Sequence, residues 1–415
     1  MTGYLTRKGI RFVAIVVAGV VAALLLWLAT NVFNVPLPGV DTSPLDVQLF
    51  VAPQAFDWVS EAAERFNAEG RRFNRRPIVI HVVERDGLSL RAQVSSASLN
   101  PAPTAWIAEG AFTLDLVNLA ASQSGSSDTF TAEGSVAQSV MMWGGFADRI
   151  AALDSNFGGL TWKALHEAAM ARSGWSSLGG QPEWGFFKLV LADPSKSSEA
   201  LAALLAAAAE YHGKTSLTAA DVNDARFQQW AQELVDAVPN FANLGSEPGK
   251  ALAVRGASAG DAGQLLEADW LSAAEGMGNW QTPAFRYAPT AVIFDFPFAV
   301  WSGPPGAGGD PSAAPSPSLR SGSGLRLSAD AAEDSSRQDA ARLFRDYLLQ
   351  DAQQRRAEAF GLRPASGNVS NAEGSLFARW ASLGFESGRP PTASAQASAD
   401  AVLAALRWAE RAAGR

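Results

Sequence analysis

The longest uninterrupted apolar segment of the chain runs from Phe12 to Ala29 and contains no charged residue. As a helix it would be roughly 27 Å long, close to the thickness of the hydrocarbon core of a bilayer. A helix that packs on a soluble domain normally carries a polar stripe, which is missing here. Three basic residues precede the segment, and no charge follows it until Asp41. The pattern predicts a transmembrane anchor over 12–29, with residues 1–11 in the cytoplasm and the following chain outside the membrane.

A cleaved signal peptide is the alternative for this segment. Its apolar run exceeds the usual core of a signal peptide, and the following WLATNVF has no small-x-small cleavage site. We therefore expect an uncleaved, single-pass anchor at the cell membrane that carries an extracytoplasmic domain. The chain has no cysteine, so neither a lipid-modified cysteine nor a disulfide is available.

After a proline-containing linker at 30–44, the hydrophobic pattern changes from strand to helix and back. LDVQLFVA at 45–52 and PIVIHVVE at 77–84 are typical of buried strands, and both are rich in branched residues. Between them, Trp58, Ala62 and Phe66 recur at helical spacing. The order strand–helix–strand is typical of a parallel crossover unit, and therefore of an α/β fold.

The same alternation continues to the end of the chain. We predict strands at 103–110, 135–143, 186–192, 251–254, 264–267 and 290–301, and helices at 87–98, 162–171, 198–211, 221–237, 338–360 and 398–412. Proline, glycine, serine and alanine dominate residues 302–324, which predicts a flexible surface loop within the domain.

Charge and histidine content exclude several function classes. The net charge of −8 argues against a nucleic-acid partner, which requires a basic face. The histidines His81, His166 and His212 are far apart, so the sequence predicts neither a metal site nor a cofactor. GASAG at 256–260 has the spacing of a nucleophile elbow around Ser258, but no histidine follows it in the chain. We therefore expect a protein that is not an enzyme and has no catalytic residues.

The loop DPSKSS, which ends at Ser198, has the chemistry of an anion site. It follows a predicted strand and precedes a long helix, whose first N–H groups are unpaired and carry partial positive charge. The hydroxyls of Ser195, Ser197 and Ser198 and the ammonium of Lys196 would add donors for an anionic or polar ligand. The alternative is a well-capped helix, since serine is a common N-cap.

An ordered set of segments resembles one known family. The segments are DVQLFVAPQAFDWVSEAAERFNAEG, PTAWIAEGAFTLDLVN, SVAQSVMMWGGFADR, LTWKALHEAA, WGFFKLVLADPSKSSEAL, AVRGASAGDAGQLLEADWL, AVIFDFPFAVW and FRDYLLQDAQQRRAEAFGLRP. Together they resemble the bacterial extracellular solute-binding proteins, in particular the subgroup often fused to a von Willebrand factor A domain. One departure is Glu199, which stands where the family often has glycine and would place a carboxylate near the anion site.

The resemblance implies a type II periplasmic-binding fold, with two α/β lobes and a solute in the cleft between them. Lobe one would comprise 45–140 and 290–415, and lobe two 141–289, with hinge strands near 139–143 and 288–294. Carried over by position, the implied ligand-binding residues are Gln54, Ala55 and Phe56, which follow Pro53 in the first loop, together with Trp106, Ser139, Ser195, Lys196, Ser197, Ser198, Arg255 and Tyr287.

Together these patterns predict a membrane-anchored protein that captures a small polar or anionic solute for transport or sensing. Its partners would be that solute and the membrane, with an ABC transporter permease or a protein with a von Willebrand factor A domain. Two rival functions remain open. One is a scaffold of the cell envelope that has kept the fold and lost the ligand, and the other is a hydrolase that uses Ser258.

Overall fold

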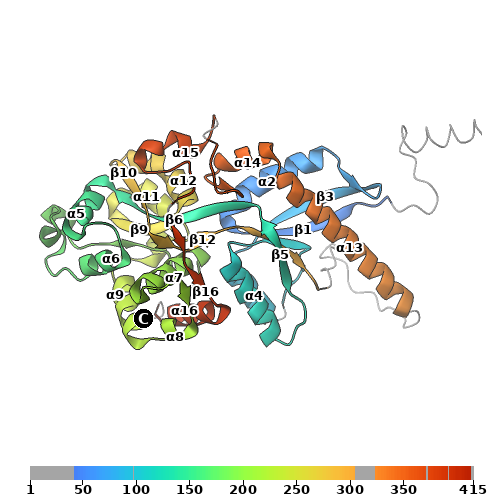
Figure 1. Ribbon diagram of the computed structural model, residues 1–415, viewed down its shortest axis with the longest axis horizontal. Helices are drawn as coiled ribbons and strands as arrows, with labels where there is room; N and C mark the ends of the chain where they lie inside the picture. Colours follow the sequence, from blue (N-terminus) through green and yellow to red (C-terminus); the bar gives the residue numbers. More distant parts are fainter. Residues whose placement is uncertain (1–41, 97, 304–322, 371–372, 391, 413–415) are drawn as a thin grey trace, which may run out of the picture.

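The computed structural model describes residues 42–96, 98–303, 323–370, 373–390 and 392–412. Two β-sheets, each covered by helices, lie side by side and form a mixed α/β fold, as predicted (Figure 1). The predicted anchor at 12–29 and most of the loop at 302–324 lie outside the described residues. Among the residues that are described, no helix is both long and apolar enough to cross a bilayer.

The first sheet and its helices are called the first lobe. Its strands follow the order β2 (Arg72–Phe73), β3 (Arg76–Glu84), β1 (Leu45–Val51), β4 (Ala105–Ile107), β13 (Pro297–Trp301) and β5 (Phe130–Ser135). Its helices are α2 (Pro53–Ala68), α3 (Gly87–Ser95), α4 (Ala111–Gln123), α13 (Ser323–Leu348) and α14 (Asp351–Glu358). Strands β3, β1 and β4 are parallel, so their carboxyl ends meet at one edge of the sheet.

The strand–helix–strand opening of the chain folds as its pattern predicts. Helix α2 begins at Pro53, a residue that suits the first helical position because it has no N–H to leave unpaired. The predicted stripe of Trp58, Ala62 and Phe66 is buried, and α2 packs on β3. The crossover from β1 through α2 to β3 is therefore confirmed.

The second sheet and its helices are called the second lobe. The sheet has the order β10 (Pro283–Tyr287), β6 (Ala137–Phe146), β9 (Ala262–Leu266) and β7 (Leu189–Val190), and β7 and β9 are parallel. Its helices are α5 (Ala147–Phe157), α6 (Trp162–Ala169), α7 (Ser198–His212), α8 (Ala219–Val222), α9 (Ala225–Asp236), α10 (Phe241–Leu244), α11 (Pro248–Arg255) and α12 (Glu267–Gly278).

Strand β6 joins the two lobes. The chain leaves β5 in the first sheet, and β6 begins two residues later. The start of β6 pairs with β14 (Arg363–Pro364) and β12 (Ile293–Phe294), and the rest pairs with β9 and β10 in the second sheet. The chain returns from β10 through β11 (Thr290–Ala291) and β12 to β13 in the first sheet.

The C-terminal segment crosses between the lobes again and ends in a helix that packs against both of them. Strand β15 (Ala393–Ser394) pairs with β11, and β16 (Gln396–Ala397) pairs with β8 (Ser216–Leu217) of the second lobe. Helix α16 (Ala399–Ala412) then packs against α4 of the first lobe and α7, α8 and α9 of the second (Figure 1). Nine of its 14 residues are buried, more than the single stripe of a surface helix.

Several predicted elements differ from the structure. The apolar run at 251–254, predicted as a strand, belongs to helix α11, which begins with Pro248 at its first turn. The run at 290–301 is divided into three short strands, because this part of the chain passes between the two sheets. The strand at 186–192 is reduced to β7, and the helix at 338–360 is interrupted between α13 and α14.

Candidate functional site

The carboxyl ends of β1, β3 and β4 bring three polar side chains to one edge of the first sheet. Gln54 follows β1, Asp86 follows β3 and Glu109 follows β4. In open α/β sheets, ligands bind beyond this edge. The Oε1 atom of Gln54 and the Oε2 atom of Glu109 are buried there without a hydrogen-bond partner in the structure.

The predicted anion loop of the second lobe is bonded largely to itself. Asp193 accepts hydrogen bonds from the backbone N–H (2.9 Å) and the hydroxyl (2.6 Å) of Ser195, and its carboxylate pairs with Lys196 at 3.1 Å. Burial raises the pKa of Asp193, but these hydrogen bonds and the Lys196 charge outweigh it, so the pKa lies below its usual value. Ser197 is the N-cap of α7 and accepts from the backbone N–H of Ala200.

One carboxylate of the first lobe occupies the amino end of α7. Oδ1 of Asp86 accepts from the backbone N–H of Leu88 (2.8 Å), which caps α3 in its own lobe. Oδ2 of Asp86 accepts from the backbone N–H of Ser198 (3.3 Å), the first residue of α7 in the second lobe. The position that the sequence suggests for an anionic ligand therefore holds a carboxylate of the chain itself. We call this contact the interlobe junction.

Glu109 lies beside Asp86 and is fully buried. Its Oε1 accepts from the backbone N–H of Gly87 at 2.7 Å. Burial, reinforced by the negative charge of Asp86, raises the pKa of Glu109 to about 8. A pKa of about 8 favours the protonated form of Glu109 at neutral pH.

Glu199 does not lie near the anion position, contrary to the expectation from the sequence. Its side chain is fully buried and turns toward the second sheet, where Oε1 accepts from the backbone N–H of Leu266 at the end of β9 (2.6 Å). Burial and the neighbouring carboxylate of Asp269 raise the pKa of Glu199 well above its usual value. The carboxyl group of Glu199 thus joins a helix to a strand within one lobe.

A cavity of about 350 Å³ lies between the lobes. Helix α4 contributes Phe112 and Asp115, helix α7 contributes Leu205, and the segment between the sheets contributes Gln138 and Asp295. The C-terminal segment contributes Arg389 and residues 394–397 to the wall. The volume falls in the range of small-ligand sites, and both lobes contribute to the wall.

Acidic groups dominate the charge of this cavity. Burial raises the pKa of Asp115, and it raises the pKa of Asp295 despite a hydrogen bond from the Ser135 hydroxyl. Arg389 supplies a positive charge at the exposed rim. Two carboxyls whose charged forms are disfavoured by burial would gain from a cation or a hydrogen-bond donor. The cavity is therefore suited to neutral or cationic polar groups.

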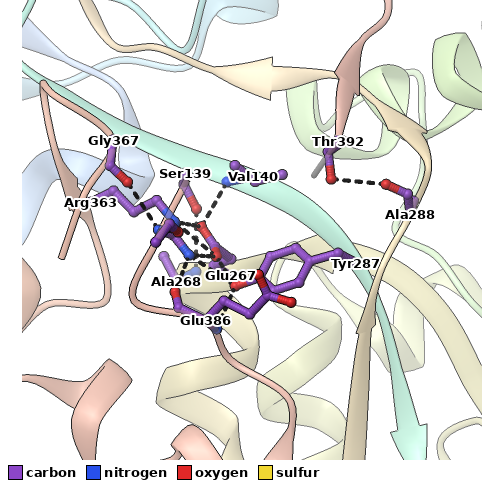
Figure 2. Close-up of polar contacts among 11 residues, drawn as sticks. Ser139, Val140, Glu267, Ala268, Tyr287, Ala288, Arg363, Gly367, Glu386 and Thr392 are labelled. Carbon is purple, nitrogen blue, oxygen red and sulfur yellow. Dashed lines mark hydrogen bonds and ion pairs between the residues drawn. The ribbon is translucent and has the colours of Figure 1, made fainter. Parts of the chain in front are cut away.

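Two of the predicted ligand-binding residues, Ser139 and Tyr287, lie in a buried polar network next to β6 (Figure 2). Glu267 and Arg363 form its centre, with the Arg363 Nη2 atom 2.7 Å from Oε1 of Glu267. Tyr287 donates to Glu267, and Oε2 of Glu267 accepts from the backbone N–H of Val140 in β6. Burial and the Glu267 charge raise the pKa of Tyr287 above its usual range.

The network anchors the C-terminal segment to the second lobe. Arg363 donates to the carbonyl oxygens of Gly367, Glu386 and Gly388, and Ser139 accepts from the backbone N–H of Ala268 (Figure 2). Ser139 and Tyr287 are thus engaged in contacts within the protein.

The other predicted residues are distributed over both lobes. Trp106 is fully buried in the first lobe, where its ring lies 5.3 Å from that of Phe130, and Ala55 is fully buried in α2. Phe56 is partly buried against the core. Arg255 donates to the carbonyl oxygen of Asn243 within the second lobe. Of the predicted set, Ser195, Lys196, Ser197 and Ser198 lie together at the start of α7, next to the interlobe junction. Gln54 lies at the same edge of the first sheet as Asp86.

The local context of Ser258 differs from that of a nucleophile elbow. It follows helix α11 through a short 3-10 turn, whereas an elbow follows a strand and opens a helix. Its hydroxyl donates to the carbonyl oxygen of Arg255 at 2.6 Å. Within the described ranges, no group of three acidic or histidine side chains has the arrangement of a metal site.

Sequence reasoning did not select Asp86, Glu109, Asp115 or Asp295. A usable signal existed for three of them: Asp86 and Glu109 follow predicted strands, and Asp295 interrupts the apolar run TAVIFDFPFAVW. Asp115 is an exposed residue within α4 and gave no such signal.

No family model and no curated protein matches the sequence. Among solved structures, the fold is similar to that of the ferric binding protein from Campylobacter jejuni, with 11% identity, a TM-score of 0.50 and coverage of 89% of this chain and 97% of that chain. A second similar structure is an ABC transporter solute-binding protein from Thermotoga lettingae bound with α-D-tagatose, with 10% identity, a TM-score of 0.49 and coverage of 89% and 94%. The chain therefore shares its fold with the ferric binding protein. Identities this low show a shared fold and say nothing about which ligand this chain binds.

Proposed function

We propose that this chain is an extracytoplasmic solute-binding protein that holds a small polar solute between its two lobes and serves transport or sensing. The observation that carries the proposal is the 350 Å³ cavity to which both lobes and the C-terminal segment contribute. The acidic groups of the cavity, Asp115 and Asp295, favour a neutral or cationic solute such as a sugar or an amine over an anion. The fold is consistent with a binding role, since the named structures are binding proteins.

The proposal includes the position of the protein in the cell. Residues 12–29 would anchor it to the membrane, with the two lobes outside and an ABC transporter permease or a protein with a von Willebrand factor A domain as partner. Alkaline extraction of membranes from cells that express the full chain tests the anchor. The protein should stay with the membrane, and a variant with Leu24→Lys and Leu26→Lys should be released. Release of the unaltered chain would contradict the anchor.

A thermal-shift panel tests the binding function. The full chain is screened against sugars, amino acids, polyamines and inorganic oxyanions, and each compound that shifts the midpoint is titrated by calorimetry. A solute at 100 times its dissociation constant should add about 2.7 kcal/mol to the free energy of unfolding. We expect a shift with a neutral or cationic compound and none with oxyanions. A panel without any shift would contradict the proposal.

A scaffold without a ligand is the second candidate, and Asp86 is the observation that favours it. The amino end of α7 already holds a carboxylate, and α16 is wedged between the lobes. In a scaffold, neither contact would have to open. The same panel separates the two candidates, because a scaffold gives no shift with any small molecule.

A further inference from the structure

We propose that the solute of the interlobe cavity is an amino acid with a second cationic group. Arg389 binds its carboxylate, and Asp115 and Asp295 bind its two ammonium groups. The inference rests on the proposed function, since it concerns the solute of that same cavity. It goes further by giving each charge of the solute a partner in the wall and by committing to a net positive charge.

The charged groups of the cavity come from different parts of the protein. Asp115 belongs to α4 of the first lobe, Asp295 to the segment between the sheets, and Arg389 to the C-terminal segment. The side chains of Asp115 and Arg389 form no hydrogen bond or ion pair with any residue that the structure describes. The wall therefore offers two acidic groups and one basic group, and two of the three have no partner within the described chain.

The two acidic groups are separated along α4. A Cβ atom on Gly110, the N-cap of α4, would lie 3.4 Å from Oδ1 of Asp295, so this carboxyl group lies at the start of the helix. Asp115 follows about one and a half turns further along α4. It shares an exposed face of the helix with Ala111, which also lines the cavity. Two separated carboxyl groups match two separated ammonium groups better than they match a single cation.

The backbone that carries Arg389 is fixed from within the protein. Arg363, which is fully buried, donates hydrogen bonds to the carbonyl oxygens of Gly388 (2.8 Å) and Glu386. Arg389 follows directly after this anchored stretch, and its side chain is exposed at the rim of the cavity. A guanidinium group is well suited to a carboxylate, with which it forms two parallel hydrogen bonds. Arg389 is therefore the partner for a carboxylate of the solute.

Much of the remaining wall is apolar. Phe112 comes from α4, Leu205 from α7, and Val292 and Ile293 from the segment between the sheets. Such a surface is suited to methylene groups, which gain free energy on leaving water. A short aliphatic chain with charged groups at its ends therefore fits the wall as a whole. A sugar offers neither the methylene groups nor the charges.

A series of compounds related to L-lysine tests the charge assignment. Cadaverine lacks the carboxylate of lysine, L-norleucine lacks its side-chain ammonium group, and 6-aminohexanoate lacks its α-ammonium group. Binding of each compound to the full chain is measured by calorimetry. We expect L-lysine to bind, and each of the other three to bind at least about tenfold more weakly, because each leaves one charge of the wall without a partner.

Variants with neutral side chains of similar size test the partners. Arg389→Gln should weaken the binding of L-lysine at least about tenfold and leave that of cadaverine unchanged, because cadaverine has no carboxylate. Asp115→Asn should weaken both compounds, because both carry two ammonium groups. Arg407→Gln and Glu64→Gln remove exposed charges outside the cavity and should bind L-lysine as the unaltered chain does. Urea unfolding of each variant shows that it is folded.

Several results would overturn the inference. They are no binding of L-lysine, binding of cadaverine, L-norleucine or 6-aminohexanoate as tight as that of L-lysine, an unchanged ratio of the lysine and cadaverine affinities in Arg389→Gln, and unchanged binding of L-lysine by Asp115→Asn. If a sugar or another compound of the panel binds and L-lysine does not, the proposed function stands and the inference fails. If neither L-lysine nor any compound of the panel binds, both fail.

Discussion

Arg363 and Glu267 form an ion pair whose side chains are both fully buried, beside the strand that joins the two lobes. Each charge is satisfied by further groups: Glu267 also accepts from Tyr287 and from the backbone N–H of Val140, and Arg363 donates to three carbonyl oxygens. Buried pairs are stable only with such additional hydrogen bonds. The pair therefore fixes the C-terminal segment against the start of β6.

Breaking this pair should destabilise the protein strongly. Glu267→Gln leaves the Arg363 charge buried without a counter-charge, and Arg363→Met does the same for Glu267. For either variant we expect the free energy of unfolding in urea to fall by about 3–5 kcal/mol. The double variant should lose less than the sum of the two losses, because neither charge is then left alone.

A surface pair of the same type is the control. Arg379 and Glu275 are 3.0 Å apart, with side chains 52% and 68% exposed. Exposed pairs contribute about 0–1 kcal/mol, so Glu275→Gln should have little effect. Equal losses for Glu275→Gln and Glu267→Gln would refute the role given to the buried pair.

Glu109 should make the stability depend on pH. Its pKa is raised from 4.5 to about 8 in the folded protein, so the folded chain holds a proton that the unfolded chain loses first. The contribution is fully present below about pH 4.5 and is lost as the pH rises to about 8, at up to roughly 1.4 kcal/mol per pH unit. Other groups titrate as well, so the measured quantity is the difference from a matched variant.

Glu109→Gln is that matched variant. It keeps an oxygen for the backbone N–H of Gly87 and has no proton to lose. In urea titrations at pH 5, 7 and 9, the stability of the unaltered chain should fall relative to Glu109→Gln as the pH rises. A difference that stays constant over this range would show that Glu109 does not hold its proton at neutral pH.

A large side chain in the interlobe cavity should abolish solute binding without unfolding the protein. Ala111 is exposed at the start of α4 and lines the cavity, so Ala111→Trp would fill part of it. We expect the affinity for the solute found in the panel to fall at least about tenfold by calorimetry, with little change in the unfolding midpoint. Ser122→Trp, exposed near the other end of α4, is the control. Unchanged binding by Ala111→Trp would place the site elsewhere.

Helix α16 should hold the two lobes together. Leu406 is 2% exposed and belongs to the same apolar cluster as Phe112 and Leu116 of α4. Leu406→Ala should lower the free energy of unfolding by about 2–5 kcal/mol, and the loss of packing should let the lobes separate. Arg407→Ala, on the exposed side of α16, should change neither the free energy of unfolding nor the distance between the lobes.

The separation of the lobes can be measured by energy transfer between two dyes, because the chain has no cysteine that would compete for labelling. Cysteines introduced at the exposed positions Glu64, in the first lobe, and Met170, in the second, take a donor and an acceptor dye. Energy transfer should decrease in Leu406→Ala and remain unchanged in Arg407→Ala. Equal transfer in all three proteins would mean that α16 does not restrain the lobes.

The hydrophobic pattern predicted the fold best where it is regular. The apolar positions of β1, α2 and β3 recur with a regular spacing over the whole of each element. The residues that this spacing predicts to be buried are therefore largely the ones that are buried. It predicted the segment at 251–254 wrongly because four apolar residues fit a strand and a helix turn equally well. It also merged β11, β12 and β13, because a passage between two sheets remains apolar while its pairing partners change.

The candidate site was less accessible from the sequence. The loop DPSKSS was recognised as the start of a helix with serine donors, and Ser197 is its N-cap as suggested. The partner of that helix end, Asp86, lies 112 residues earlier and belongs to the other lobe. Such a contact depends on how the two lobes approach each other, which no local pattern encodes.

Strand β6 has a mechanical consequence. Its first residues are bonded to β12 and β14, and its remaining residues are bonded to β9 and β10, all within one continuous backbone. The two ladders meet between Val140, which pairs with β12, and Met141, which pairs with β9. The strand therefore offers no unpaired residue as a hinge, and a bend within it would break hydrogen bonds of one ladder or the other.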